Sequence, residues 1–485
     1  MRFFEITFLV ILALSVPGLL FLKNKKHKMV LPLLGLAIFI ICMLAEGYRY
    51  IMAPAYITGA LVLIVSLYSY FSVSTKKHPA LKGVGVAFFI IAYIASVMLT
   101  TYLPVVNLPA PSGPYLVGTI KMDFIHPSRK NIVSGEYGEQ KIVVQAWYPA
   151  ADKGKGKKAR WIESRKAVSL FSGRLGLPDI FDNLYQAKTN SYPDAPIVEE
   201  GRTFPVILFS DGMGFFVGQN TMQMEELASR GYAVFSVSHP DDDFAVIYAD
   251  GELTAYSAEK SGVISDDSSA ALEIAKSREA DEKSAGFMRI FIKESSLTQE
   301  NLRIWSGDMS FAADQLEKLN NGTIQSMFRN KLNLSAIGIF GHSYGGAAAG
   351  ETCLLDDRFK AFINLDGTPF GDTVDTVIEK PFMVISSAPD LSLPITPGDC
   401  YAEEQTGHRT VSIDGAYHMN FTDLNVLISK AGKTFSALGP INAARQTEIV
   451  NAYIVSFFNK HLRDLDEPLL NGTTSLYPEV RVIEY

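Results

Sequence analysis

The sequence has few cysteines and no excess of positive charge. Its only cysteines are Cys42, Cys353 and Cys400, far apart among 485 residues. They show no metal-binding spacing and no disulfide framework, although a single pairing of Cys353 with Cys400 stays open. The formal net charge of −7 gives no indication of nucleic-acid binding. We therefore expect neither a metal site nor a nucleic-acid partner.

Apolar residues, in contrast, are abundant. They make up 48% of the chain, the mean hydropathy is +0.13, and the excess lies near the N-terminus. Each of the long apolar stretches there has about the length that a helix needs to cross a bilayer: Phe4–Leu22, Val30–Ala45, Tyr56–Val73 and Val84–Leu103. A cleaved signal peptide is the weaker interpretation, because the first stretch lacks a small-residue cleavage site and its basic cluster follows it. We expect residues 1–104 to form a four-helix transmembrane domain.

The loops between these stretches differ in charge. The first and third loops hold the lysines Lys23, Lys25, Lys26, Lys28, Lys76, Lys77 and Lys82, whereas the second loop holds only Glu46 and Arg49. Lysine-rich loops face the cytoplasm by the positive-inside rule. The sequence therefore predicts a multi-pass protein of the cell membrane, with everything after Leu103 on the extracytoplasmic side.

The stretch "LPVVNLPAPSGPY" predicts an extended linker at residues 105–114, followed by a globular domain at 115–485. In that domain, strand-like runs alternate with helical patterns, which is typical of an α/β fold with a mostly parallel sheet and helices on both faces. The expected strands are Leu116–Phe124, Lys141–Tyr148, Val206–Ser210, Ala233–Ser238, Ala336–Gly341, Ala361–Asp366, Phe382–Ser387 and Arg409–Ile413. The expected helices include Thr221–Arg230, Gly307–Leu319, Tyr344–Leu355 and Gln446–Leu462. The acid-rich interval at about 241–305 interrupts the alternation, and we expect it to be an inserted lid.

One motif in this domain carries chemistry. "AIGIFGHSYGGAAAGE" contains Gly341-His342-Ser343-Tyr344-Gly345, which matches G-x-S-x-G, the nucleophile elbow of α/β-hydrolases. The serine sits on a tight turn from strand to helix, and the flanking glycines avoid a collision between backbones that pass close together. The motif also arises by chance, so its context must decide.

Activation of Ser343 requires a base and an acid. The fold places them after the serine in the order acid, then histidine. Of the later histidines, His461 falls in a helical pattern and His408 precedes a strand, whereas His418 follows the strand Arg409–Ile413 at its carboxyl end. His418 is therefore the expected base. Asp366 and Asp390 each follow a strand, and position alone leaves the acid open between them.

The oxyanion hole needs two backbone N–H groups. One should come from Tyr344, the residue after the nucleophile. The loop "FSDGMG" after an early strand supplies a second candidate, the N–H of Met213, because its glycines let the backbone turn inward.

Most of Leu108–Asp423 resembles the plasma-type platelet-activating factor acetylhydrolases, a family of calcium-independent phospholipases A2 with the α/β-hydrolase fold. The resemblance lies in the segments "LPAPSGPYLVGT", "VQAWYPA", "FSDGMG", "LASRGYAVFSVSHPD", "GHSYGG", "NLDGTPFG" and "YHMNFTD". It implies Asp366 as the acid. Two positions depart from the family: Asp211 stands where histidine is usual, and Tyr344 where phenylalanine is common. Both act through their backbones, so the hole should survive, while the added charge of Asp211 is expected to affect substrate choice.

These observations predict a membrane-anchored serine ester hydrolase that cleaves short sn-2 acyl esters of phospholipids without metal or cofactor. The alternatives are a general carboxylesterase, a lactone or polyester hydrolase, and a non-catalytic membrane sensor on a hydrolase fold. The complete Ser343, Asp366 and His418 set argues against the sensor.

Overall fold

A computed structural model describes residues 1–72, 79–199, 201–389, 395–402, 405, 408–472 and 474–484. The chain divides into two compact units. The helical unit comprises Met1–Val106 and Ser172–Ala187, and the sheet unit comprises Asn107–Phe171 and Lys188–Tyr485. The chain therefore passes between the units after residues 106, 171 and 187. The sequence predicts a globular domain over 115–485, whereas in the structure the segment 172–187 packs with the N-terminal helices.

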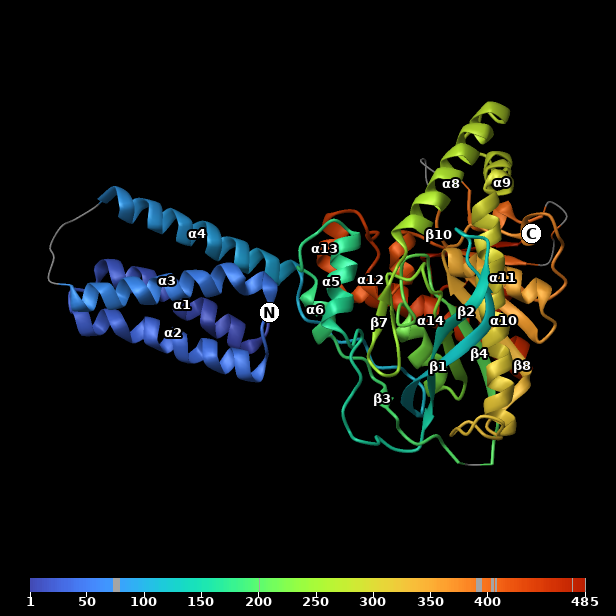
Figure 1. The fold of residues 1–485 in the computed structure, drawn as a ribbon, viewed down its shortest axis with the longest axis horizontal. Helices are drawn as coiled ribbons and strands as arrows, with labels where there is room; N and C mark the ends of the chain where they lie inside the picture. The colour runs from blue at the N-terminus through green and yellow to red at the C-terminus, as the bar shows by residue number, and fades with distance from the viewer. Residues whose placement is uncertain are drawn as a thin grey trace. The chain divides into compact units, whose positions relative to one another are not determined.

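The helical unit contains four long helices, α1 (Phe3–Phe21), α2 (Lys25–Ala45), α3 (Ala53–Phe71) and α4 (Pro79–Tyr102), with a 3₁₀ turn at Tyr50–Met52 (Figure 1). All four are long and apolar enough to cross a membrane. Phe8, Leu12 and Val62 lie in the core between the helices. Other large apolar side chains, such as Phe21 and Phe71, point outward, as expected where the surroundings are lipid. Lys76 and Lys77 of the third loop lie outside the described residues.

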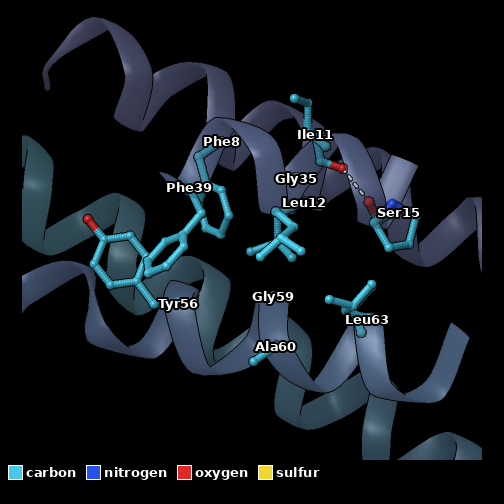
Figure 2. Close-up of a pocket in the computed structure, with 13 residues that line it drawn as sticks. Phe8, Ile11, Leu12, Ser15, Gly35, Phe39, Tyr56, Gly59, Ala60 and Leu63 are labelled. Atoms are coloured by element: carbon cyan, nitrogen blue, oxygen red, sulfur yellow. Dashed lines mark hydrogen bonds between the residues drawn. The ribbon is translucent and has the colours of Figure 1, made fainter. Parts of the chain in front are cut away.

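A cavity of about 150 Å³ lies between α1, α2 and α3 (Figure 2). Phe8, Leu12 and Leu63 are among the apolar side chains on its wall. The hydroxyl of Ser15 on the same wall donates to the carbonyl oxygen of Ile11 at 2.7 Å, so it is already satisfied. The lining is therefore mainly apolar.

A buried arginine joins the segment 172–187 to the helices. Arg49 is fully buried. Its guanidinium lies 3.2 Å from the carboxylate of Glu5 and 3.5 Å from that of Asp182, and it donates to the carbonyl oxygen of Leu103 at 2.6 Å. A buried guanidinium without partners would be costly, so these contacts explain why Arg49 can lie inside the unit. Sequence reading treated it as an ordinary loop charge.

The sheet unit is built on a ten-stranded sheet in the order β12-β11-β10-β9-β8-β4-β5-β2-β1-β3. Neighbouring strands from β11 to β5 are parallel, whereas β12, β2 and β1 run antiparallel to their inner neighbours. The strands are β1 (Leu116–Lys130), β2 (Tyr137–Ala150), β3 (Tyr192–Pro193), β4 (Phe204–Ser210), β5 (Ala233–Val237), β8 (Leu332–His342), β9 (Phe359–Leu365), β10 (Phe382–Ser387), β11 (Arg409–Ile413) and β12 (Val480–Glu484).

Helices cover both faces of this sheet (Figure 1). Along β4, Ile207 and Phe209 point into one core and Val206 and Leu208 into the other, the alternation expected of a strand buried on both sides. Helices α7 (Thr221–Ser229) and α14 (Ala443–Arg463) contribute to the first core, and α10 (Ser296–Asn321) and α11 (Tyr344–Leu355) to the second. The expected mostly parallel sheet with helices on both faces is confirmed.

The interval expected to be a lid has its own structure. It contains the hairpin β6 (Ala245–Ile247) and β7 (Leu253–Ala255), then α8 (Ala258–Arg278) and α9 (Ala285–Glu294). Its expected end at residue 305 falls inside α10, because Trp305 and Met309 continue one buried face of that helix. A lid function for 241–305 stays a prediction.

The remaining helices are α5 (Arg165–Arg174), α6 (Asp182–Gln186), α12 (Leu424–Leu427) and α13 (Ser429–Thr434). The remaining 3₁₀ turns are Asp372–Val374, Pro397–Cys400, His418–Phe421 and Pro468–Asn471.

Candidate active site

Ser343 occupies the turn between β8 and α11. Its backbone angles are φ 56° and ψ −124°, a strained conformation for a residue other than glycine. The two flanking glycines are required by close backbone approach. A Cβ at Gly341 would collide with the carbonyl oxygen of Gly345, and a Cβ at Gly345 would collide with that of Asp211. The G-x-S-x-G motif therefore has the elbow geometry that its spacing predicts.

His418 lies beside this serine, in the turn that follows β11. Its Nε2 is 2.9 Å from Oγ of Ser343, and its Nδ1 is 2.8 Å from Oδ2 of Asp366. The side chain of His418 is 46% exposed, so the pair is accessible from outside. The structure thus brings together Ser343, the expected base His418 and Asp366, which is one of the two candidate acids.

Asp366 is held from behind by Ser387, whose backbone N–H and hydroxyl both donate to Oδ1 at 2.8 and 2.9 Å. Burial opposes ionisation, but the hydrogen bonds from His418 and Ser387 outweigh it and hold the pKa of Asp366 below its usual value. The carboxylate is therefore ionised at neutral pH and accepts a hydrogen bond from the protonated Nδ1 of His418. That tautomer leaves Nε2 of His418 as the acceptor for the Ser343 hydroxyl.

The other two histidines considered for the base lie elsewhere. His408 stacks on Phe382, and His461 contacts Phe457 on its own helix. Asp390, the second candidate acid, lies outside the described residues.

The three cysteines are buried and unpaired, so Cys353 and Cys400 are separate thiols. Within the described ranges, no group of three or more His, Cys, Asp or Glu side chains is arranged to hold a metal ion.

The expected oxyanion donors flank the serine. Tyr344 is the first residue of α11, where backbone N–H groups have no partner within the helix. Met213 belongs to the loop after β4, which we call the oxyanion loop (residues 211–214). This loop lies against the elbow, since a Cβ at Gly212 would be 3.4 Å from Cβ of Ser343. In the part of the chain that the structure describes, neither the Met213 nor the Tyr344 amide donates to a protein acceptor.

Asp211 in this loop is fully buried. Burial, and then the charge of Asp242, raise its pKa well above the usual value. The family resemblance had suggested that its charge affects substrate choice. The carboxyl group does not reach solvent, and the neutral acid is favoured.

Sequence reasoning missed residues that shape the turn after β9. Asn364 accepts a hydrogen bond from the Gly367 backbone N–H at 2.8 Å and donates to the Gly367 carbonyl oxygen at 2.6 Å. These two hydrogen bonds hold the turn that contains Asp366, whose φ of 54° is in the left-handed region. The available signal was an asparagine inside the apolar run "AFINL", because a polar side chain in a buried strand needs specific partners.

Comparisons with known proteins show the family to which the chain belongs. The family model described as platelet-activating factor acetylhydrolase, isoform II, matches residues 101–474. The platelet-activating factor acetylhydrolase of Cavia porcellus is 25% identical over 389 residues, which cover 76% of this chain and 81% of the relative. A probable 1-alkyl-2-acetylglycerophosphocholine esterase of Arthroderma benhamiae is 30% identical over 163 residues, or 30% of this chain and 42% of the relative.

Among solved structures, a ferulic acid esterase from Streptomyces cinnamoneus matches with a TM-score of 0.61 and 24% identity. The match covers 78% of this chain and all of that one, and it supports the fold alone. The fold expected from the sequence, that of an α/β-hydrolase, is confirmed. The chain is a carboxylic ester hydrolase, and it belongs to the platelet-activating factor acetylhydrolase, isoform II, family.

Proposed function

We propose that the protein is a membrane-anchored serine ester hydrolase that removes short sn-2 acyl groups from phospholipids. Ser343 is the nucleophile, His418 the general base and acid, and Asp366 the residue that orients His418. The backbone N–H groups of Met213 and Tyr344 bind the oxyanion. The single observation that carries this proposal is the continuous hydrogen-bonded series from Asp366 through His418 to Ser343, with distances of 2.8 and 2.9 Å.

The chemistry follows from this series. His418 Nε2 takes the hydroxyl proton while Ser343 Oγ attacks the ester carbonyl carbon, and the tetrahedral oxyanion receives hydrogen bonds from the two amides. The intermediate collapses to an acyl-serine, and His418 returns the proton to the departing lysophospholipid oxygen. Water, deprotonated by the same imidazole, then hydrolyses the acyl-serine and releases the short acid. Asp366 stabilises the imidazolium in both halves.

The four apolar helices support the membrane anchor. The last of them ends at Tyr102, and the first strand of the sheet unit starts at Leu116. A linker of this length reaches at most about 50 Å when extended. The catalytic unit is thereby kept at high effective concentration near the lipid surface. Such an arrangement favours a substrate that resides in the membrane or leaves it, and the relatives are named for a phospholipid of that type.

Purified full-length protein is expected to release acetate from a phosphatidylcholine-like lipid with an acetyl group at sn-2. Hydrolysis should be undiminished by a chelator, because serine, histidine and aspartate supply every step. The measurement is acid release from micelles or vesicles with and without chelator, with Ser343→Ala as the blank. Brisk cleavage of simple esters without acid release from these lipids would instead identify a general carboxylesterase.

The membrane topology gives a separate test. A reporter that is active only outside the cytoplasm should be active when fused after Leu103 and silent when placed near Lys25 or Lys77, because the lysine-rich loops face the cytoplasm. Reporter activity in live cells measures this directly. The reverse pattern would place the hydrolase in the cytoplasm.

A further inference from the structure

A buried glutamine connects the two sides of the candidate site. The Gln219 side chain, between β4 and α7, is fully buried. Its Oε1 accepts a hydrogen bond from the Gly212 backbone N–H at 2.6 Å, and its Nε2 lies 2.6 Å from Nδ1 of His342. His342 immediately precedes Ser343, and its Nε2 lies 3.1 Å from the carbonyl oxygen of His418.

The two groups at the ends of this series, the Gly212 N–H and the His418 carbonyl oxygen, determine which atom donates in each of its hydrogen bonds. The Gly212 N–H can only donate, so it must face the carbonyl oxygen of the Gln219 amide, which leaves the NH₂ group for His342. Nδ1 of His342 must then be an unprotonated acceptor. The proton of the neutral ring therefore lies on Nε2, where it is donated to the His418 carbonyl oxygen, which can only accept.

The surroundings of His342 keep this ring neutral. Burial, and then the neighbouring His418 ring at 4.6 Å between centroids, lower the pKa of His342 to about 3, against a smaller opposing effect of Asp366. His342 and Gln219 are too deeply buried to touch a substrate. Their effect on the site is therefore exerted through the groups that they hold.

Close packing adds to these bonds. A Cβ at Gly212 would lie only 3.0 Å from Nδ1 of His342, so the oxyanion loop approaches the ring as closely as glycine allows. The backbone around Gln219 also holds the loop of the base. The Gln219 carbonyl oxygen accepts from the Asp423 N–H at 2.9 Å, and Asn220 donates to the Phe421 carbonyl oxygen at 2.7 Å.

We propose that Gln219 and His342 are positioning residues that act as one hydrogen-bonded series, holding the oxyanion loop and His418 in register with Ser343. The inference rests on the proposed function, because it assigns these residues to the same serine hydrolase site. Loss of the series leaves the Gly212 N–H, and hence the adjoining Met213 amide, without its support. It also removes the hydrogen bond from Nε2 of His342 to the carbonyl oxygen of His418.

The test is a double-mutant cycle in the full-length protein, with a soluble short-chain ester as substrate. Gln219→Leu and His342→Phe remove the hydrogen-bonding atoms and keep most of the volume. Each should lower kcat by about 10-fold to 10²-fold, the effect of a small misplacement of catalytic groups, with little change in KM. The double variant should lose no more than the worse single variant, because one broken link already interrupts the series.

Two further variants separate positioning from folding. Gln315→Leu removes another buried amide, which lies on α10 and bonds to Phe311 and Lys318 of the same helix. It should change at most the melting temperature, while kcat stays within about twofold, because Gln315 does not contact the series. His342→Gln keeps an acceptor and a donor and should retain more kcat than His342→Phe; this comparison carries the test if Gln219→Leu does not fold.

The inference is overturned by wild-type kcat in Gln219→Leu, by additive losses in the double variant, or by equal losses in His342→Gln and His342→Phe. Each of these results leaves the proposed function intact, provided that the wild type hydrolyses esters far faster than Ser343→Ala does. A wild type without ester hydrolysis would instead defeat the proposed function itself.

Discussion

Replacing Ser343 by alanine should lower ester turnover by on the order of 10⁴-fold or more. In the proposed mechanism the variant removes the atom that forms a bond to the acyl group, whereas the proposed oxyanion donors remain. Residual activity should therefore stay above the uncatalysed rate. Initial rates with a short-chain ester, measured for purified wild type and variant at equal concentration, give the ratio.

Ser236→Ala is a matched control for this variant. Ser236 lies on β5, is fully buried, and its hydroxyl has no hydrogen-bond partner among the described residues. Its loss should change turnover by no more than a few-fold, because it has no part in the site. Turnover in Ser343→Ala above about one per cent of wild type would contradict the assignment of the nucleophile, and a wild type as inactive as the variant would favour a non-catalytic sensor.

Asp366→Asn should be nearly as damaging, with a loss of about 10⁴-fold in kcat. Ser387 donates twice to Oδ1 of residue 366, so the asparagine oxygen should take that position and direct its NH₂ group at Nδ1 of His418. His418 would then carry its proton on Nε2 and could no longer accept the proton of Ser343. Steady-state kinetics of the purified variant measures the effect.

The companion variant is Asp390→Asn, which changes the other aspartate that position alone leaves open. It should retain most of the wild-type kcat. Full activity in Asp366→Asn together with loss of activity in Asp390→Asn would transfer the role of the acid to Asp390.

The parts of the site that sequence predicts are those with local causes. Gly341 and Gly345 flank Ser343 within five residues, and the collision that excludes a side chain at Gly341 lies within the turn itself, although that at Gly345 involves the backbone of Asp211. His418 follows from chain order and from its place at the carboxyl end of a strand. Position could not choose between Asp366 and Asp390, because both follow parallel strands, whereas the contact of Asp366 with His418 depends on the three-dimensional turn after β9.

The parts that sequence missed depend on distant partners. Gln219 and His342 are separated by 123 residues along the chain, and no local pattern marks their pairing. β12 was missed because its short segment becomes a strand by pairing with β11 at the edge of the sheet. Arg49 looked like a loop charge because its partner Asp182 follows 133 residues later. Tertiary contacts override local preference at each of these places.

In the proposed mechanism, Ser343 is a nucleophile that His418 activates. The measurement that tests it most directly is the site of covalent modification after the full-length protein reacts with a fluorophosphonate, located by mass spectrometry of its peptides. Phosphonylation should map to Ser343, be absent in Ser343→Ala, and be strongly slowed in His418→Ala, because the reagent needs an activated hydroxyl. An unmodified Ser343 in a reagent-treated wild type, or a modification at another residue that persists in Ser343→Ala, would contradict the claim.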